Sequence, residues 1–200
     1  MAVLAMAFLG PVAAAAALVA GGETSDAERL GPVAFLSAAA GSSSPERPTG
    51  VRRKCSQRSE AEFPGAYTSG RNFVLGPLAM IGAGGRGYFS RAFGGAKFPL
   101  LVENGHRVTL KLTRRVRRGA SLAYGPLRRG RKGVRRGYRT ITFVACREDE
   151  PSGSSADGTP VTFWSGGILA RSRRCVPLRM WVDESGPQRA VIRLGVRGCS

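Results

Sequence analysis

The chain is predicted to be all-β, either an antiparallel β-sandwich of the immunoglobulin-like kind or a small barrel, stapled by two disulfides. Two observations predict this class. From Cys55 onward, short apolar or alternating segments are separated by turns rich in Gly, Pro, Asn and Ser, and no segment shows a capped helical period of three turns. The same region contains all four cysteines, an even number that disulfides would use completely.

The clearest strand is expected over residues 107–113, where Val108, Leu110 and Leu112 alternate with polar side chains. A second apolar run, residues 98–103, comes just before it. The two runs are joined by Asn104-Gly105, the pair best able to take the positive φ angles of a type I′ turn. A β-hairpin is therefore predicted over these residues.

Six further strands complete the expected sandwich. Gly76-Pro77 is expected to interrupt the first of them, and Gly166-Gly167 the one that contains Trp164, as bulges or bends. The two tryptophans, Trp164 and Trp181, are expected to fill the core, with a sugar-stacking platform as the alternative. The predicted strands cover residues 72–81, 121–124, 139–146, 161–170, 176–183 and 189–196.

The cysteines are expected to pair as Cys55-Cys199 and Cys146-Cys175, among three arrangements that four cysteines allow. The first bond would tie the two ends of the domain, and the second would tie two strand ends across a polar loop. In the loop-entropy treatment they contribute about 5 and about 3.6 kcal/mol. A zinc site is disfavoured because the close ligand pairs that zinc requires are missing, so no metal is predicted.

Residues 1–22 carry no charged side chain and are mostly apolar, which predicts a signal peptide or an N-terminal anchor. A signal cleaved near Ala20 is favoured, and an uncleaved anchor is the alternative. Residues 23–54 are rich in Ala, Gly, Ser and Pro and are predicted to be a flexible linker, which leaves residues 55–200 as the folded domain. The protein is therefore expected outside the cell or on the outer face of the membrane, where thiols oxidise.

The chain has a net charge of +18, and most of this charge is local. Between Arg86 and Arg139 there are 16 Lys and Arg but only one acidic residue, Glu103. Guanidinium groups pair bidentately with phosphate and carboxylate, so this region is the candidate binding surface. The candidate residues are Arg114, Arg115, Arg117, Arg118, Arg128, Arg129, Arg131, Lys132, Arg135 and Arg136.

Two interpretations of this charge remain open. In the first, the basic region binds anionic polymers or an anionic membrane surface, with no specific nucleic acid expected. In the second, the arginines are a solvated surface that reflects a GC-rich genome, because Arg outnumbers Lys by 27 to 4.

No catalytic motif is convincing. Residues 82–87 fit a G-x-G-x-x-G spacing, but glycines and a proline follow where a dinucleotide fold needs a helix. Ser165 lacks the preceding glycine of a nucleophile elbow. His106, the only histidine, is expected to be an exposed turn residue with no orienting partner. Residues 148–150 are acidic but match no calcium loop. Hence no catalytic residue and no cofactor is predicted.

Three segments of this chain resemble a group of small exported proteins from GC-rich bacteria that have no assigned function. They begin at Phe73 (Phe-Val-Leu-Gly-Pro-Leu), Val161 (Val-Thr-Phe-Trp-Ser-Gly) and Arg174 (Arg-Cys-Val-Pro-Leu). The resemblance covers most of residues 73–199 and implies export and a β domain with two disulfides. It implies no mechanism and no functional residues.

The expected function is that of an exported, non-enzymatic envelope or extracellular module that binds anions through its arginine-rich face. A secreted enzyme with a site assembled from scattered residues is the first alternative. A basic nucleic-acid-binding protein is the second, and the apolar N-terminus argues against it.

Overall fold

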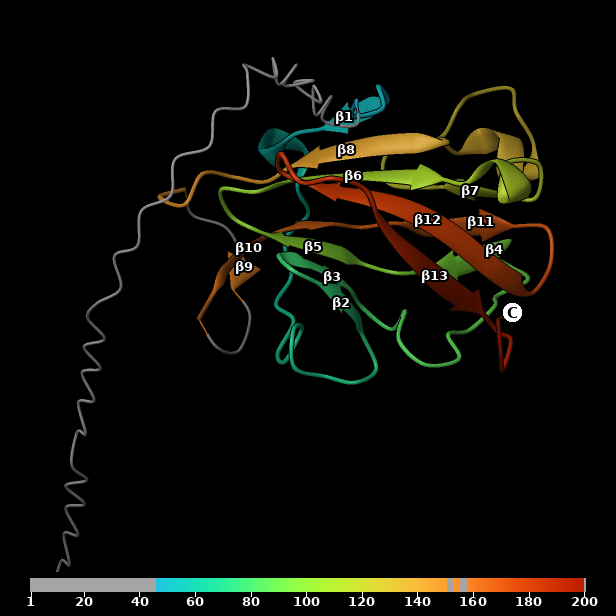
Figure 1. Cartoon of the computed structure of the whole chain (residues 1–200), viewed down its shortest axis with the longest axis horizontal. Coiled ribbons are helices and arrows are strands. Elements are labelled where there is room, and N and C mark those ends of the chain that lie inside the picture. Colours follow the sequence, from blue (N-terminus) through green and yellow to red (C-terminus); the bar gives the residue numbers. More distant parts are fainter. Residues whose placement is uncertain (1–45, 151–152, 155–157, 200) are drawn as a thin grey trace, which may run out of the picture. The chain divides into compact units, whose positions relative to one another are not determined.

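Two layers of β-sheet enclose a shared apolar core (Figure 1). The computed structural model describes residues 46–150, 153–154 and 158–199. The predicted signal peptide or anchor, residues 1–22, lies outside them. None of the helices among the described residues is long and apolar enough to cross a membrane.

The first layer is a five-stranded sheet with the order β1-β8-β6-β12-β13. Four of its strands pair antiparallel, whereas β1 runs parallel to β8. The strands are β1 (Val51–Arg53), β8 (Thr140–Val144), β6 (Arg107–Leu112), β12 (Arg174–Val182) and β13 (Gln188–Leu194).

The second layer consists of two smaller sheets placed end to end. One has the order β2-β3-β5-β10-β9 and the other β4-β11-β7. They are joined because the chain passes directly from β4 to β5 and from β10 to β11. The strands are β2 (Phe73–Leu75), β3 (Leu78–Met80), β5 (Leu100–Glu103), β10 (Pro160–Trp164), β9 (Gly153–Ser154), β4 (Gly95–Lys97), β11 (Gly167–Ala170) and β7 (Ala120–Leu122).

Alternate residues of the two layers fill the core, as the period of a half-buried strand predicts. Val108, Leu110 and Leu112 of β6 are fully buried. Phe143 lies between the rings of Tyr124 and Trp164, with centroid distances of 5.3 and 5.1 Å. No pairing among the described strands joins the five-stranded sheet to the second layer. The structure is therefore an open sandwich rather than a barrel, and it confirms the predicted all-β class.

The predicted hairpin over residues 98–113 is wrong, although both of its strands form. β5 lies in one layer and β6 in the other, so the Asn104-Gly105 turn connects the two layers. Only Gly105 has a positive φ, at 82°, whereas a type I′ turn needs two such residues. The Asn104 side chain donates to the carbonyl of Arg147 at 3.0 Å and accepts from Thr162 Oγ1 at 2.8 Å. The bond to Thr162 ties the turn to β10 of the second layer, and the bond to Arg147 ties it to the segment that follows β8.

Both expected strand interruptions occur, but neither is a bulge. Gly76-Pro77 is the two-residue turn of a hairpin between β2 and β3, in which Leu75 pairs with Leu78. At Gly166-Gly167 the register does not change, because Trp164 pairs with Leu100 and Gly167 with Lys97. The ladder is broken opposite Pro99, which has no N–H to donate. A Cβ on Gly167 would lie 2.1 Å from the carbonyl oxygen of Ala96, so this close approach requires glycine.

All four cysteines are bonded, as predicted, but the predicted partners are wrong. The bonds are Cys55–Cys146 and Cys175–Cys199. Cys55 follows β1 and Cys199 follows β13, which are opposite edges of the same sheet. Four strand spacings amount to about 19 Å, far beyond the Cα separation of about 7 Å that a disulfide can bridge.

The folded region also begins earlier than the expected boundary at residue 55. β1 adds an edge strand before Cys55, with Val51 opposite Ile141 and Arg53 opposite Phe143. The chain before β1 is close to the sheet as well, since a Cβ on Gly50 would lie 2.6 Å from the Thr140 carbonyl oxygen. The predicted linker, residues 23–54, therefore cannot extend to residue 54, because its last residues pair with β8.

Candidate anion-binding site

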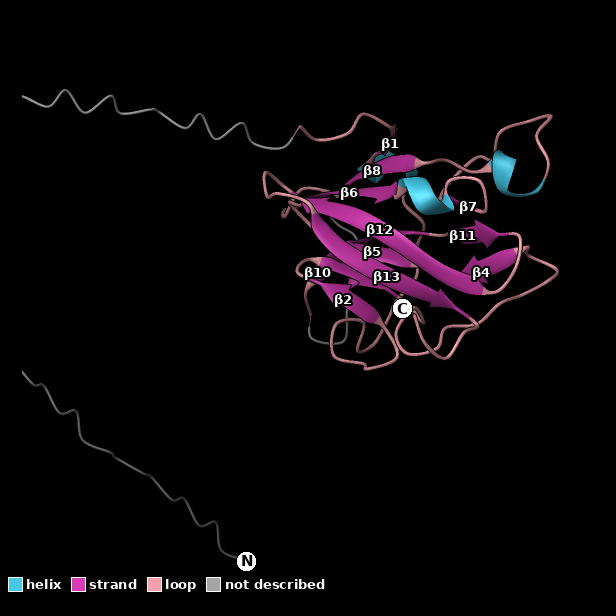
Figure 2. Cartoon of the chain, turned by 45° about the vertical axis from the view of Figure 1, so that its right-hand side comes forward, coloured by secondary structure: helices cyan, strands magenta, loops and turns pink. Residues whose placement is uncertain are grey.

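The two arginine-rich connections of the sequence meet at one end of the sandwich. One contains the 3-10 helix η2 (Arg114–Val116) and joins β6 to β7, and the other contains η3 (Gly133–Arg136) and leads into β8. Both lie at the right-hand end in Figure 1, and they are the two large helical turns of Figure 2. We call this region, residues 113–119 and 125–139, the basic end.

Acidic residues are concentrated at the other end of the strands. The β5–β6 turn follows Glu103, the β12–β13 turn contains Asp183 and Glu184, and residues 148–150 follow β8. The ion pairs among the described residues involve Arg47, His106, Arg107 and Arg147. The arginines of the basic end thus have no carboxylate partner within the described part of the chain.

The loop of residues 125–137 is held in place by several contacts. Leu122 and Tyr138 exchange two backbone hydrogen bonds of 2.9 and 2.8 Å, which close the loop at its base. The Tyr138 hydroxyl donates to the Pro126 carbonyl at 2.7 Å, and the Arg128 amide donates to the Arg136 carbonyl at 2.8 Å. Val134 is buried with Ala123 and Leu169 in a small separate core. The charged side chains therefore project from an ordered backbone.

A pocket of about 230 Å³ opens in this loop and is lined by Arg128, Arg131, Arg135, Gly137 and Arg139. We call it the loop pocket. Arg139 is half-buried and donates to the Ala120 carbonyl at 2.6 Å. The Arg128 guanidinium lies 5.1 Å from the centre of the Tyr138 ring, a cation–π contact that limits its orientations.

The electrostatics of the loop pocket favour an anion. Partial burial, followed by the positive charges of Arg117 and Arg128, lowers the pKa of the Arg139 guanidinium. The same repulsion shows that arginines from both connections lie within electrostatic reach of one another. A phosphate, sulfate or carboxylate would relieve this repulsion and pair with the guanidinium forks.

A second basic pocket, of about 410 Å³, lies where β6 runs into η2. It is lined by Lys111, Leu112, Thr113, Arg114, Arg117 and Arg179. We call it the strand pocket. Lys111 and Arg179 reach it from neighbouring strands, β6 and β12, on which they are direct partners.

Five of the ten predicted binding residues therefore line a pocket. Arg128, Arg131 and Arg135 line the loop pocket, and Arg114 and Arg117 line the strand pocket. The other five lie in the same connections but line neither of these pockets; they are Arg115, Arg118, Arg129, Lys132 and Arg136.

Sequence reasoning missed three positively charged lining residues: Arg139, Lys111 and Arg179. Lys111 and Arg179 occur singly within predicted strands, so no cluster in the sequence marks them. The signal that could have found them is their position on the polar face of those strands.

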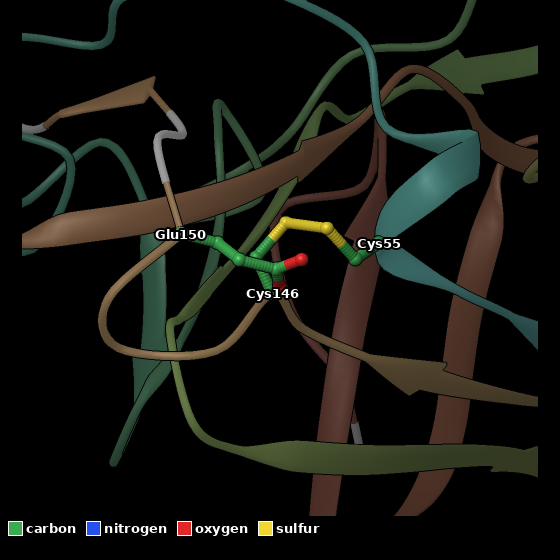
Figure 3. Close-up of side chains that lie close together, drawn as sticks. All are labelled: Cys55, Cys146 and Glu150. Carbon is green, nitrogen blue, oxygen red and sulfur yellow. A yellow bond between two sulfur atoms is a disulfide. The ribbon is translucent and has the colours of Figure 1, made fainter.

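One group of metal-type ligand atoms occurs among the described residues, formed by Cys55, Cys146 and Glu150 (Figure 3). Both sulfurs are committed to a disulfide, so neither is a thiolate that could bind a metal. The Glu150 carboxylate instead accepts the Arg147 amide at 2.7 Å. This group is a covalent staple beside a turn.

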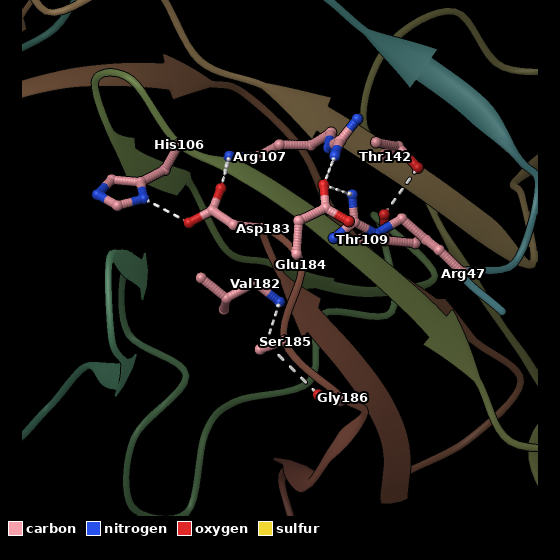
Figure 4. Close-up of polar contacts among 10 residues, drawn as sticks. All are labelled: Arg47, His106, Arg107, Thr109, Thr142, Val182, Asp183, Glu184, Ser185 and Gly186. Atoms are coloured by element: carbon pink, nitrogen blue, oxygen red, sulfur yellow. Dashed lines mark hydrogen bonds and ion pairs between the residues drawn. The ribbon is translucent and has the colours of Figure 1, made fainter. Parts of the chain in front are cut away.

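His106 has an orienting partner, contrary to the expectation from sequence. Its Nδ1 lies 2.7 Å from Asp183 Oδ2, and the Arg107 amide donates to Asp183 Oδ1 at 2.8 Å (Figure 4). Arg107 also pairs with Glu184. None of the described serine, threonine or cysteine side chains bonds to His106. The pair therefore links the β5–β6 turn to the β12–β13 turn and has no nucleophile in contact with it.

The same contacts predict how acid destabilises this end. Burial alone would raise the pKa of Asp183, but the hydrogen bonds from His106 and Arg107 and the charges of His106 and Arg47 together lower it below 3.8. A carboxyl whose pKa is lower in the folded chain stabilises the fold above its unfolded pKa. That contribution is lost as pH falls through the folded pKa.

We therefore expect Asp183→Asn to be less stable than the wild type at pH 7 and equal to it near pH 2, as measured by urea unfolding. Asparagine tolerates the positive φ of this position, 45°, so the substitution tests the charge. An equal loss at both pH values would show that the charge is not responsible.

Comparisons with protein-family models, curated proteins and solved structures find no match for this chain. The function of the basic end is therefore inferred from its own geometry and charge.

Proposed function

We propose that the folded domain is an exported, non-enzymatic module that holds an anionic polymer at its basic end. The observation that carries this proposal is the loop pocket, in which four arginines converge with no carboxylate partner among the described residues. An unoccupied cluster of like charges opposes folding, and a bound anion removes the repulsion. The ordered loop backbone lowers the entropic cost of holding these side chains around a ligand.

The proposed location, outside the cell or on its outer face, is supported by two observations. Both disulfides suit an oxidising compartment. The uncharged, mostly apolar segment of residues 1–22 is consistent with it. Anions available there include carboxylated or sulfated polymers and the headgroups of anionic lipids.

The test compares the full chain with the triple variant Arg128→Ser, Arg131→Ser, Arg135→Ser, using heparin as the polymer. Each anion that a cation neutralises releases counterions, so log affinity falls linearly with log salt concentration. If each contact contributes about 0.7 to the slope, the variant should flatten it by about 2. Its stability should change by less than about 0.5 kcal/mol per site, because the three side chains are exposed.

The matched control removes the same charge elsewhere, through Arg58→Ser, Arg71→Ser and Arg86→Ser. These arginines are also exposed and lie outside both pockets. An equal loss of slope in the control would show that binding depends on total charge, and it would contradict the proposal. Binding to anionic vesicles but not to heparin would replace the polymer with a lipid surface.

A further inference from the structure

The outer face of the five-stranded sheet carries a row of positively charged side chains that lie on strands and do not belong to the two arginine-rich connections. Arg179 of β12 lies directly opposite Lys111 of β6 on one side and Arg189 of β13 on the other. Neighbouring strands are about 4.8 Å apart, so three positive side chains span about 10 Å in a line. We call Lys111, Arg179 and Arg189 the sheet row.

In the absence of a bound anion, the charge repulsion within the sheet row lowers the stability of the fold. Like charges directly opposite each other on neighbouring strands destabilise a sheet, and here two such pairs share Arg179. Arg179 and Arg189 are exposed and Lys111 is half-buried. Among the described residues, none of the three forms an ion pair or a side-chain hydrogen bond that would offset the repulsion.

The sheet row also continues into the basic end. Lys111 and Arg179 line the strand pocket together with Arg114 and Arg117, which belong to the η2 connection. Cations thus follow one another from the η2 connection of the basic end through the strand pocket and across the sheet.

We propose that the sheet row is a second contact surface for a linear, carboxylated or sulfated polysaccharide, which lies across β6, β12 and β13 and continues to the basic end. This inference rests on the proposed function and names its ligand class. A sugar polymer with an anion on successive units offers a line of charges that matches a line of cations, whereas an isolated anion fills one pocket only.

The composition of this face favours a sugar polymer over nucleic acid. Proteins that bind single strands stack bases on exposed aromatic side chains. Trp181, two residues from Arg179 on the same face of β12, is only 4% exposed. The large apolar side chain that is exposed on this face is Val191, at 47%. The face therefore offers charge pairing without a stacking platform.

The experiment uses the full chain with the variant Lys111→Thr, Arg179→Thr, Arg189→Thr, since threonine suits an exposed strand position. Affinity is measured against salt for long heparin and for a heparin tetrasaccharide. We expect the salt slope for the long polymer to flatten by about 2, as for the loss of three contacts. The tetrasaccharide should bind at the loop pocket almost as tightly as it does to the wild type, because the variant changes none of the residues that line this pocket.

A second measurement separates binding from folding. Removing the two like-charge pairs should raise the urea midpoint of the variant while its affinity for long heparin falls.

A fluorescence measurement locates the bound polymer. Polymer on this face should change the fluorescence of Trp181, and Trp181→Phe should remove that change. The other tryptophan, Trp164, lies in the core between the layers, so its fluorescence should not respond.

The outcomes distinguish this inference from the proposed function. If the sheet-row variant keeps the wild-type salt slope while the slope of the loop-pocket variant flattens, the sheet row is not a contact surface and the proposed function stands. If the salt slope flattens equally in all three variants, including the Arg58/Arg71/Arg86 control, both proposals fail. Tighter binding of single-stranded DNA than of heparin would overturn the assignment to a polysaccharide.

Discussion

Replacing Cys55 and Cys146 together with alanine is expected to lower the free energy of unfolding by about 4.6 kcal/mol. The bond joins residues 91 positions apart, so it removes a large loop-closure entropy from the unfolded chain. It also fixes the β1 edge of the first sheet to the end of β8. Urea unfolding of the oxidised variant, compared with the oxidised wild type, measures the loss.

The second disulfide provides the matched comparison. Cys175 and Cys199 are 24 residues apart, and the same treatment gives about 3.4 kcal/mol for their removal. Non-reducing mass spectrometry of proteolytic peptides should join Cys55 to Cys146 and Cys175 to Cys199. A larger loss from the shorter loop would contradict the entropic explanation, and peptides joining Cys55 to Cys199 would contradict the fold.

Phe143→Ala is expected to cost about 3–5 kcal/mol, the range for removing an aromatic side chain from a packed core. Phe143 is fully buried and contacts two other aromatic rings, Tyr124 of the connection after β7 and Trp164 of β10. The substitution would leave a cavity between the two layers and remove both ring contacts. Urea unfolding and the near-ultraviolet circular dichroism of Trp164 measure the effect.

Val191→Ala is the control, because Val191 lies in the same sheet but is 47% exposed. Its stability should change by less than about 0.5 kcal/mol. Phe143→Leu, which keeps much of the volume, should lose stability in the same direction but by less than the alanine variant. Equal effects at Phe143 and Val191 would show that the interface between the layers is not the main core.

The contrast between the disulfide bonds and the strands shows which interactions sequence can reveal. The strand at 107–113 was predictable because its alternation is local, and the structure buries the apolar side chains that this alternation selects. The partner of Cys55 was not predictable. It depends on a parallel pairing between β1 and β8, two segments that lie about 90 residues apart and carry no matching signal.

The Asn104-Gly105 turn shows a different limit. The turn residues and both flanking strands were identified correctly, yet the strands separate into different layers. Each strand instead pairs with strands from distant parts of the chain, and the Asn104 side chain bonds to Arg147 and Thr162, which are also distant. The conformational preference of two adjacent turn residues carries no information about partners so distant in the sequence, so it could not predict this arrangement.

The same distinction applies to the candidate site. The all-β class, the oxidation of all four cysteines and the concentration of positive charge in two connections were predictable, because each of these follows from composition or from short-range period. The folded chain was needed to see that Arg128 and Arg139 share a pocket, and that Lys111, Arg179 and Arg189 form one row. Strand pairing brings these side chains together, and pairing is chosen by the burial of apolar faces across the whole domain.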